Sequence, residues 1–86
     1  MQDPALTFMY YVYCFRHIRT GEFYYGYTEN LQRRSVEHGP LWQLMYYEAY
    51  LAEADARRRE RKLKDYGQAR SKLKERLRES LKVSAG

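Results

Sequence analysis

Runs of apolar and aromatic side chains predict three β-strands. Met9 to Phe15 contains no polar break, which is typical of a central strand covered on both faces. Thr20-Gly21 is a turn signal, and the aromatic stretch Phe23 to Thr28 predicts a second strand that pairs with the first as a hairpin. Trp42 to Tyr50 predicts a third strand, in which Trp42, Leu44 and Tyr46 alternate with Gln43, Met45 and Tyr47.

The intervening segments predict three helices. Short polar side chains at 28–30 can cap a helix that runs to about His38, since Pro40 disfavours helical geometry in Gly39. A second helix is expected from about Ala52 to Tyr66, with Gly67 as its C-terminal cap. A third should cover Gln68 to Lys82, with leucines at 73, 77 and 81 on one stripe. The order β-β-α-β-α-α predicts an α+β fold, in which helices flank a small three-stranded antiparallel or mixed sheet.

Length and composition indicate a single domain over residues 1–86, with its core at about 8–82 and frayed termini. Cys14 is the only cysteine, so the chain can form neither an internal disulfide nor a multi-cysteine zinc site. There is no apolar run of ~18 residues, and the first residues lack the pattern of a secretory signal. We therefore expect a soluble, cytoplasmic protein that does not enter a membrane.

The charge is unevenly distributed. Residues 1–56 hold four Lys/Arg and seven Asp/Glu, a net charge of −3, whereas residues 57–86 hold twelve Lys/Arg and four Asp/Glu, a net charge of +8. A basic C-terminal third on an aromatic body indicates a polyanionic partner. The alternative is a basic helix face that is only solvated.

Glu60 interrupts the predicted apolar stripe of the second helix. The stripe passes through Ala52, Ala56, Leu63 and Tyr66, and Glu60 lies four residues after Ala56 and three before Leu63. A carboxylate on an inward stripe is costly unless it is paired or binds a metal. It could therefore bind a cation or form an ion pair with one of the neighbouring arginines.

Arg34 and His38 share the face of Leu31 in the first helix, whereas Arg33 points elsewhere. An inward guanidinium beside a histidine suits a bound phosphate. The alternatives are that Arg34 only extends its charged end to solvent or pairs with a carboxylate, and that His38 only closes the helix.

Tyrosines converge on the predicted hairpin. With a turn at residues 19–20, Tyr13 falls opposite or diagonal to the Tyr24–Gly26 stretch, within side-chain reach. Gly26 inside a strand often marks a close backbone approach. A tyrosine in a strand is most often a core residue with a solvated hydroxyl, so each of these residues alone is a weak signal.

Taken together, these residues resemble the GIY-YIG nuclease family, in particular small bacterial members related to the N-terminal endonuclease domain of UvrC. Tyr11-Val12-Tyr13 stands for Gly-Ile-Tyr, and Tyr24-Tyr25-Gly26 stands for Tyr-Ile-Gly. The resemblance continues through 27–38, the third strand and the helix that carries Glu60, over residues 8 to about 78. It departs from the family in the bulkier first motif and in the short 39–41 connection, where relatives often carry a longer polar loop.

The resemblance implies a divalent-metal-dependent endonuclease that hydrolyses DNA phosphodiester bonds with little sequence specificity. Glu60 would bind Mg²⁺ or Mn²⁺, Arg34 would contact the scissile phosphate, and Tyr13 or Tyr24 would take the proton from the attacking water. A neighbour must favour the anionic phenol, and His38, Arg34 or the metal could do so.

The predicted partner is DNA, including branched or single-stranded forms, bound by a monomer or a transient dimer. The candidate backbone contacts are Arg33, Arg57, Arg61, Lys62, Lys64, Arg70 and Lys72. Two other functions fit the same sequence: a nucleic-acid-binding module with an idle site, and an interaction domain whose basic helices dock an acidic protein.

Overall fold

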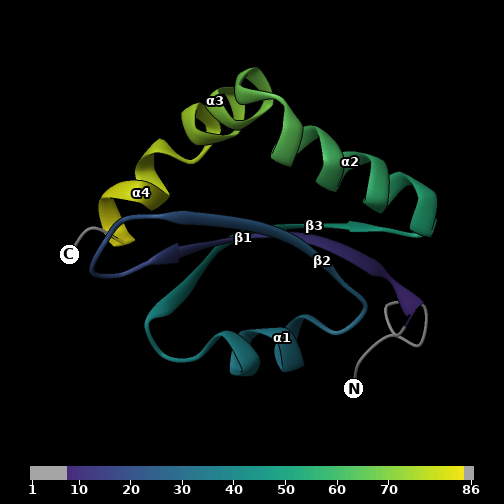
Figure 1. Cartoon of the computed structure of the whole chain (residues 1–86), viewed down its shortest axis with the longest axis horizontal. Coiled ribbons are helices and arrows are strands. Elements are labelled where there is room, and N and C mark those ends of the chain that lie inside the picture. Colours follow the sequence, from purple (N-terminus) through teal and green to yellow (C-terminus); the bar gives the residue numbers. More distant parts are fainter. Residues whose placement is uncertain (1–7, 85–86) are drawn as a thin grey trace.

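The computed structural model describes residues 8–84 and contains a three-stranded antiparallel sheet with helices on both faces (Figure 1). The strands are β1 (Tyr10–His17), β2 (Phe23–Thr28) and β3 (Trp42–Tyr50), in the spatial order β2-β1-β3. The helices are α1 (Leu31–His38), α2 (Glu53–Asp65), α3 (Gly67–Arg76) and α4 (Arg78–Ser84). This confirms the predicted α+β class and the central position of the first strand. The terminal segments that we expected to be frayed lie mostly outside the described residues.

The two faces of the sheet are covered differently. Figure 1 shows α1 alone on one face and α2, α3 and α4 on the other. On the α2–α4 face, Val12 and Cys14 of β1 pack against Ala56, Leu63 and Leu73, and all five are almost fully buried. On the α1 face, Tyr13 and Phe15 are equally buried. The uninterrupted apolar run of β1 follows from this two-sided burial.

The hairpin turn and the ends of α1 lie where the sequence predicts, although β1 continues two residues beyond Phe15 to His17. Gly21 adopts a φ of 77° in the β1–β2 connection, a conformation that glycine favours. The Asn30 side chain caps α1 by accepting a 3.0 Å hydrogen bond from the backbone N–H of Arg33. Gly39 ends the helix with a φ of 89°.

The strict alternation predicted for β3 is wrong beyond Leu44. Phe15 pairs with Leu44 and Cys14 with Tyr46, so Met45 is the extra residue of a bulge. Tyr46 therefore packs with Met45 against the α2–α4 core, although the sequence placed these two residues on opposite faces. Tyr47 turns to the α1 face, where its ring lies 5.8 Å from that of Tyr11.

The end of α2 also differs from the prediction. Tyr66 is extended and 62% exposed, so it is not part of the buried stripe, and neither is Ala52 at the other end. Gly67 is the first residue of α3 and has no positive φ, so it does not act as a left-handed cap. The Arg70 side chain caps the end of α2 instead, because its Nη1 donates 2.8 Å hydrogen bonds to the carbonyls of Leu63 and Lys64.

The single helix predicted for 68–82 is instead α3 and α4, separated at Leu77. Leu77 leaves helical geometry with φ −98° and ψ 13° while Leu73 and Leu77 stay buried. Arg16 of β1 holds the second piece, because its Nη1 donates hydrogen bonds to the Leu81 carbonyl (3.3 Å) and Ser84 Oγ (2.8 Å). The bend keeps the leucine stripe against the curved sheet. Among residues 8–84, no helix has both the length and the apolar composition that a membrane crossing requires.

Candidate active site at the β2 edge of the sheet

The hairpin register places Tyr13 of β1 directly opposite Gly26 of β2. A Cβ added to Gly26 would lie 3.0 Å from Cε1 of Tyr13 and closer still to its hydroxyl end. The Tyr13 ring therefore lies across the Gly26 backbone, in space that any side chain would occupy. This is the close approach that a glycine within a strand indicates.

His38, the last residue of α1, packs against this ring from the helix side. Its Nε2 lies 3.5 Å from the Tyr13 hydroxyl oxygen, and its ring centre lies 4.5 Å from that of Phe15. Tyr24 adds a second phenol, with its ring 6.2 Å from Tyr13 and 4.9 Å from His38. The two tyrosines differ in access, because Tyr13 is 2% exposed and Tyr24 is 42% exposed.

Helix α2 brings Glu60 to the same edge of the sheet. A carboxylate oxygen of Glu60 lies 3.3 Å from Nζ of Lys64, one helical turn further on. That ammonium in turn lies 5.8 Å from the centre of the Tyr24 ring. Glu60 is thus linked through Lys64 to the aromatic cluster on the other face of the sheet, although α1 and α2 lie on opposite sides.

Arg34 of α1 lies close enough for its charge to act on Tyr13 and His38. Its Nε lies 3.6 Å from the Glu37 carboxylate, and its side chain is 39% exposed. Nε itself is buried and donates no hydrogen bond to any described residue. A buried donor without an acceptor is unfavourable, so this guanidinium is suited to an additional anionic acceptor.

The electrostatics at Tyr13 reflect all of these groups. Burial raises the pKa of Tyr13 to about 12, with further contributions from Tyr24, Glu60 and Glu37, while the Arg34 charge acts to lower it. Burial, with a smaller contribution from Arg34, lowers the pKa of His38 below 6.5. At neutral pH, Tyr13 is therefore protonated and His38 is neutral, so Nε2 of His38 can accept the Tyr13 hydrogen bond.

Glu60 is a carboxylate at this edge that could bind a hard cation. Its side chain is 19% exposed, and within residues 8–84 no three His, Cys, Asp or Glu side chains come together. Mg²⁺ commonly binds proteins through one or two carboxylates and fills its remaining positions with water and phosphate oxygens. A single carboxylate beside an open edge matches that requirement.

The structure shows which protein partners these side chains have within residues 8–84. Glu60 does form an ion pair, with Lys64 rather than with an arginine. Arg34 does face a carboxylate, that of Glu37. His38 does close α1, and it also contacts both tyrosines.

The predicted backbone contacts separate into different environments. Arg33 and Arg61 are exposed, and Arg57 donates to Glu53 while it covers the Tyr27 ring at 4.3 Å. Lys62 and Lys72 line a cavity between α2 and α3. Lys64 lies inside the candidate site, and Arg70 is held at the end of α2.

Sequence reasoning missed two aromatic members of the cluster. The ring centre of Trp42 lies 6.0 Å from that of His38 and 6.3 Å from that of Tyr24. The ring centre of His17 lies 5.0 Å from that of Trp42. Both could have been predicted from the alternation of side chains along a strand, because residues 13, 15 and 17 share one face. Trp42 begins the next strand after α1, so it lies near that face as well.

No protein-family model, curated protein or solved structure matched the chain when it was compared with each. Any activity assigned to the site therefore rests on its residues and their geometry.

Proposed function

We propose that this chain is a divalent-metal-dependent endonuclease that hydrolyses DNA phosphodiester bonds. The observation that carries the proposal is the convergence at the β2 edge, where Glu60 and Lys64 of α2 meet Tyr24, and Tyr24 packs on His38 and Tyr13. A carboxylate, a phenol and a guanidinium can supply cation binding, proton transfer and charge stabilisation, which are useful for phosphodiester hydrolysis.

The GIY-YIG resemblance belongs to the same proposal. Its two tripeptides, Tyr11-Val12-Tyr13 and Tyr24-Tyr25-Gly26, lie on the paired strands β1 and β2. The glycine of the second motif faces the tyrosine of the first, which supports interpreting the two as one structural unit.

Glu60 would hold the cation through a carboxylate oxygen. The bound Mg²⁺ or Mn²⁺ would supply positive charge to phosphate oxygens and to the leaving oxygen. Lys64, 3.3 Å from the same carboxylate, can balance the charge of Glu60 when no cation is bound.

Tyr24 is the phenol best placed to take the proton from the attacking water. A general base must reach its substrate, and Tyr24 is exposed while Tyr13 is enclosed and has a pKa of about 12. Tyr13 then acts as a positioning residue, because its ring holds His38 and Tyr24 in place across Gly26.

Arg34 would bind the scissile phosphate. Its side chain is 39% exposed, so the outer part of the guanidinium can reach a phosphate whose oxygens gain charge during attack.

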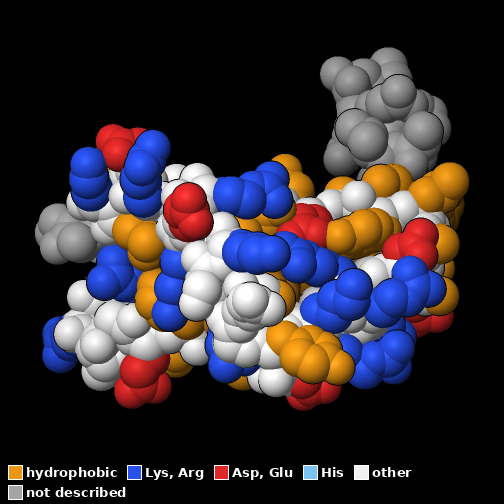
Figure 2. Space-filling model, turned by 90° about the horizontal axis from the view of Figure 1, so that it is seen from above, with side chains coloured by type: hydrophobic (Ala, Val, Ile, Leu, Met, Phe, Trp, Pro, Cys, Tyr) orange, Lys and Arg blue, Asp and Glu red, His pale blue; other side chains and the backbone are white. Residues whose placement is uncertain are grey.

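The α2–α4 surface would add affinity that depends little on sequence. Figure 2 shows Lys and Arg side chains spread over this face, interrupted by a few acidic ones. Contacts of this kind bind the nucleic-acid backbone and weaken steeply as salt rises.

A second candidate function is a nucleic-acid-binding module with an idle site. The observation that favours it is the Glu60–Lys64 ion pair, which satisfies the carboxylate without a metal. The two proposals differ in whether any DNA strand is cut.

The test is a cleavage assay with supercoiled, branched and single-stranded DNA in Mg²⁺, in Mn²⁺ and in EDTA. The endonuclease proposal predicts nicked products with either metal and none in EDTA, with nicks preceding double-strand breaks because each chain has one site. DNA binding without cleavage of any substrate would instead establish the idle module.

A further inference from the structure

Helix α2 has two polar sides that face different regions of the molecule. On the side of β2, Glu53 accepts a 2.9 Å hydrogen bond from Tyr27, and Lys64 covers Tyr24. On the opposite side, Arg59 donates to both Glu48 oxygens of β3 at 2.9 and 3.1 Å. The candidate active site belongs to the first side only.

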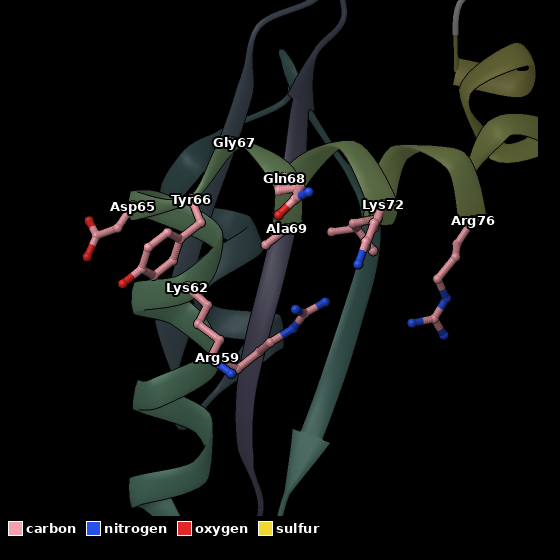
Figure 3. Close-up of a pocket in the computed structure, with 10 residues that line it drawn as sticks. Arg59, Lys62, Asp65, Tyr66, Gly67, Gln68, Ala69, Lys72 and Arg76 are labelled. Atoms are coloured by element: carbon pink, nitrogen blue, oxygen red, sulfur yellow. The ribbon is translucent and has the colours of Figure 1, made fainter.

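The second side of α2 forms one wall of a cavity of about 660 Å³, with α3 as the other wall. Four cationic side chains line it, Arg59 and Lys62 from α2 and Lys72 and Arg76 from α3, against one carboxylate, Asp65. Figure 3 shows Arg59, Lys62 and Lys72 extending toward the space between the helices, whereas Asp65 points away from it.

Three of these cations lack an internal counter-charge. Glu48 balances Arg59, but Lys62, Lys72 and Arg76 form no ion pair with any residue in 8–84. Like charges around one cavity repel one another, and a bound anion removes that repulsion. Gly67 and Gln68 also line the cavity, and the amino end of a helix adds partial positive charge.

The lining is not only cationic. Tyr66 is part of the lining and 62% exposed, with its ring directed to the same side as Asp65 in Figure 3, and Ala69 and Leu73 supply apolar surface. An exposed aromatic ring beside unpaired cations is the combination that binds single-stranded nucleic acid, since bases stack on the ring and phosphates meet the charges. The cavity volume suits a ligand the size of one nucleotide rather than the surface of a nucleic-acid duplex, because pockets of ~300–1,000 Å³ bind small molecules.

We propose that the α2–α3 cavity binds one nucleotide of a single-stranded nucleic acid, with its phosphate against Lys62, Lys72 and Arg76. Tyr66 stacks on the base. This rests on the proposed function in taking nucleic acid as the partner, and it adds that the substrate carries an unpaired strand. A duplex would meet only the rim of the cavity. A neighbouring pocket lined by Lys72, Glu75, Arg76 and Arg78 lies beyond the cavity, and its Arg78 offers a second phosphate contact along the strand.

The experiment measures the affinity of 5′-labelled hexathymidylate by fluorescence anisotropy in EDTA, so that cleavage plays no part. The test variant is Lys62→Gln/Lys72→Gln, and the control is Arg19→Gln/Lys82→Gln, which removes the same charge outside the cavity. The test variant should bind ~10-fold more weakly, and its salt slope should fall by up to ~0.7, the value for one phosphate contact on a single strand. Backbone amide signals of Gly67 and Gln68 should shift when the wild type binds.

Equal weakening of the two double variants would overturn the inference, because general charge would then explain binding. Displacement of the oligonucleotide by polyglutamate at equal charge would also overturn it and would identify an acidic protein as the ligand. Failure of this inference and failure of the proposed function give different results in these experiments. If the protein binds the oligonucleotide at this cavity but cuts no DNA, the inference stands and the nuclease proposal fails. If the protein cuts DNA but the two double variants bind equally, the nuclease proposal stands and the inference fails.

Discussion

The Tyr13 ring lies in the space that a side chain at Gly26 would need. The two residues face each other across β1 and β2, and an added Cβ would lie 3.0 Å from Cε1 of Tyr13 and closer to the hydroxyl. The two sequence motifs are thus joined by direct packing, which holds the Tyr13 hydroxyl at His38.

Gly26→Ala should therefore destabilise the fold by ~1–3 kcal/mol, the usual cost of overpacking a filled site. Chemical denaturation measures it. Gly67→Ala is the matched control, because a Cβ there would lie 3.6 Å from the Arg70 guanidinium, an ordinary contact at the start of a helix. The control should be neutral or stabilising by up to ~1 kcal/mol. Equal stabilities for the two variants would show that the Tyr13 ring does not occupy this space.

The two tyrosines should differ in their effect on cleavage. Tyr24→Phe removes the exposed phenol and should slow single-turnover cleavage by ~10²–10⁴-fold, the range for loss of a general base. Tyr13→Phe keeps the ring that packs on Gly26 and loses only a 3.5 Å contact with His38, so its effect should be much smaller. The reverse order would make Tyr13 the base and would contradict the roles proposed above.

Arg34→Gln should lower the cleavage rate by ~10²–10³-fold while DNA affinity changes little. The reason is that Arg34 would act mainly on the negative charge that develops on the phosphate in the transition state. Arg19→Gln is the charge-matched control in an exposed loop and should leave the rate unchanged. Separate measurement of the rate at saturating DNA and of the dissociation constant tests this. A loss confined to affinity would make Arg34 an ordinary backbone contact.

His38 should make stability depend on pH on the acidic side. Burial and Arg34 lower its pKa below the usual 6.5, so the folded state favours neutral His38. This contribution is complete above pH 6.5 and is lost as pH falls through the lowered pKa. Wild type should thus lose more free energy of unfolding between pH 7.5 and 5 than His38→Gln. An equal loss in both proteins would show that His38 is not held in its neutral form.

The sequence predicted the elements well where local chemistry decides them. The turn at Gly21, the Asn30 cap and the central apolar strand all follow from side chains acting on their own segment. Features decided by distant packing were missed. The bulge at Met45 depends on pairing with β1, and the break at Leu77 depends on how α4 meets the sheet and Arg16.

The candidate site likewise contains contacts that local sequence predicts and contacts that depend on distant packing. Leu31 spacing placed Arg34 and His38 on one face, and the hairpin placed Tyr13 opposite Gly26. The connection of Lys64 to both Glu60 and Tyr24 could not be predicted, because it depends on how α2 lies along the β2 edge.

The central claim is that one carboxylate at the β2 edge makes the chain a metal-dependent nuclease. The most direct measurement compares single-turnover nicking of supercoiled DNA in Mn²⁺ by wild type, Glu60→Gln and the surface control Glu79→Gln, each purified in the same way. We predict that wild type and Glu79→Gln nick equally, and that Glu60→Gln binds DNA but does not cut it. Nicking by Glu60→Gln at the wild-type rate would contradict the claim.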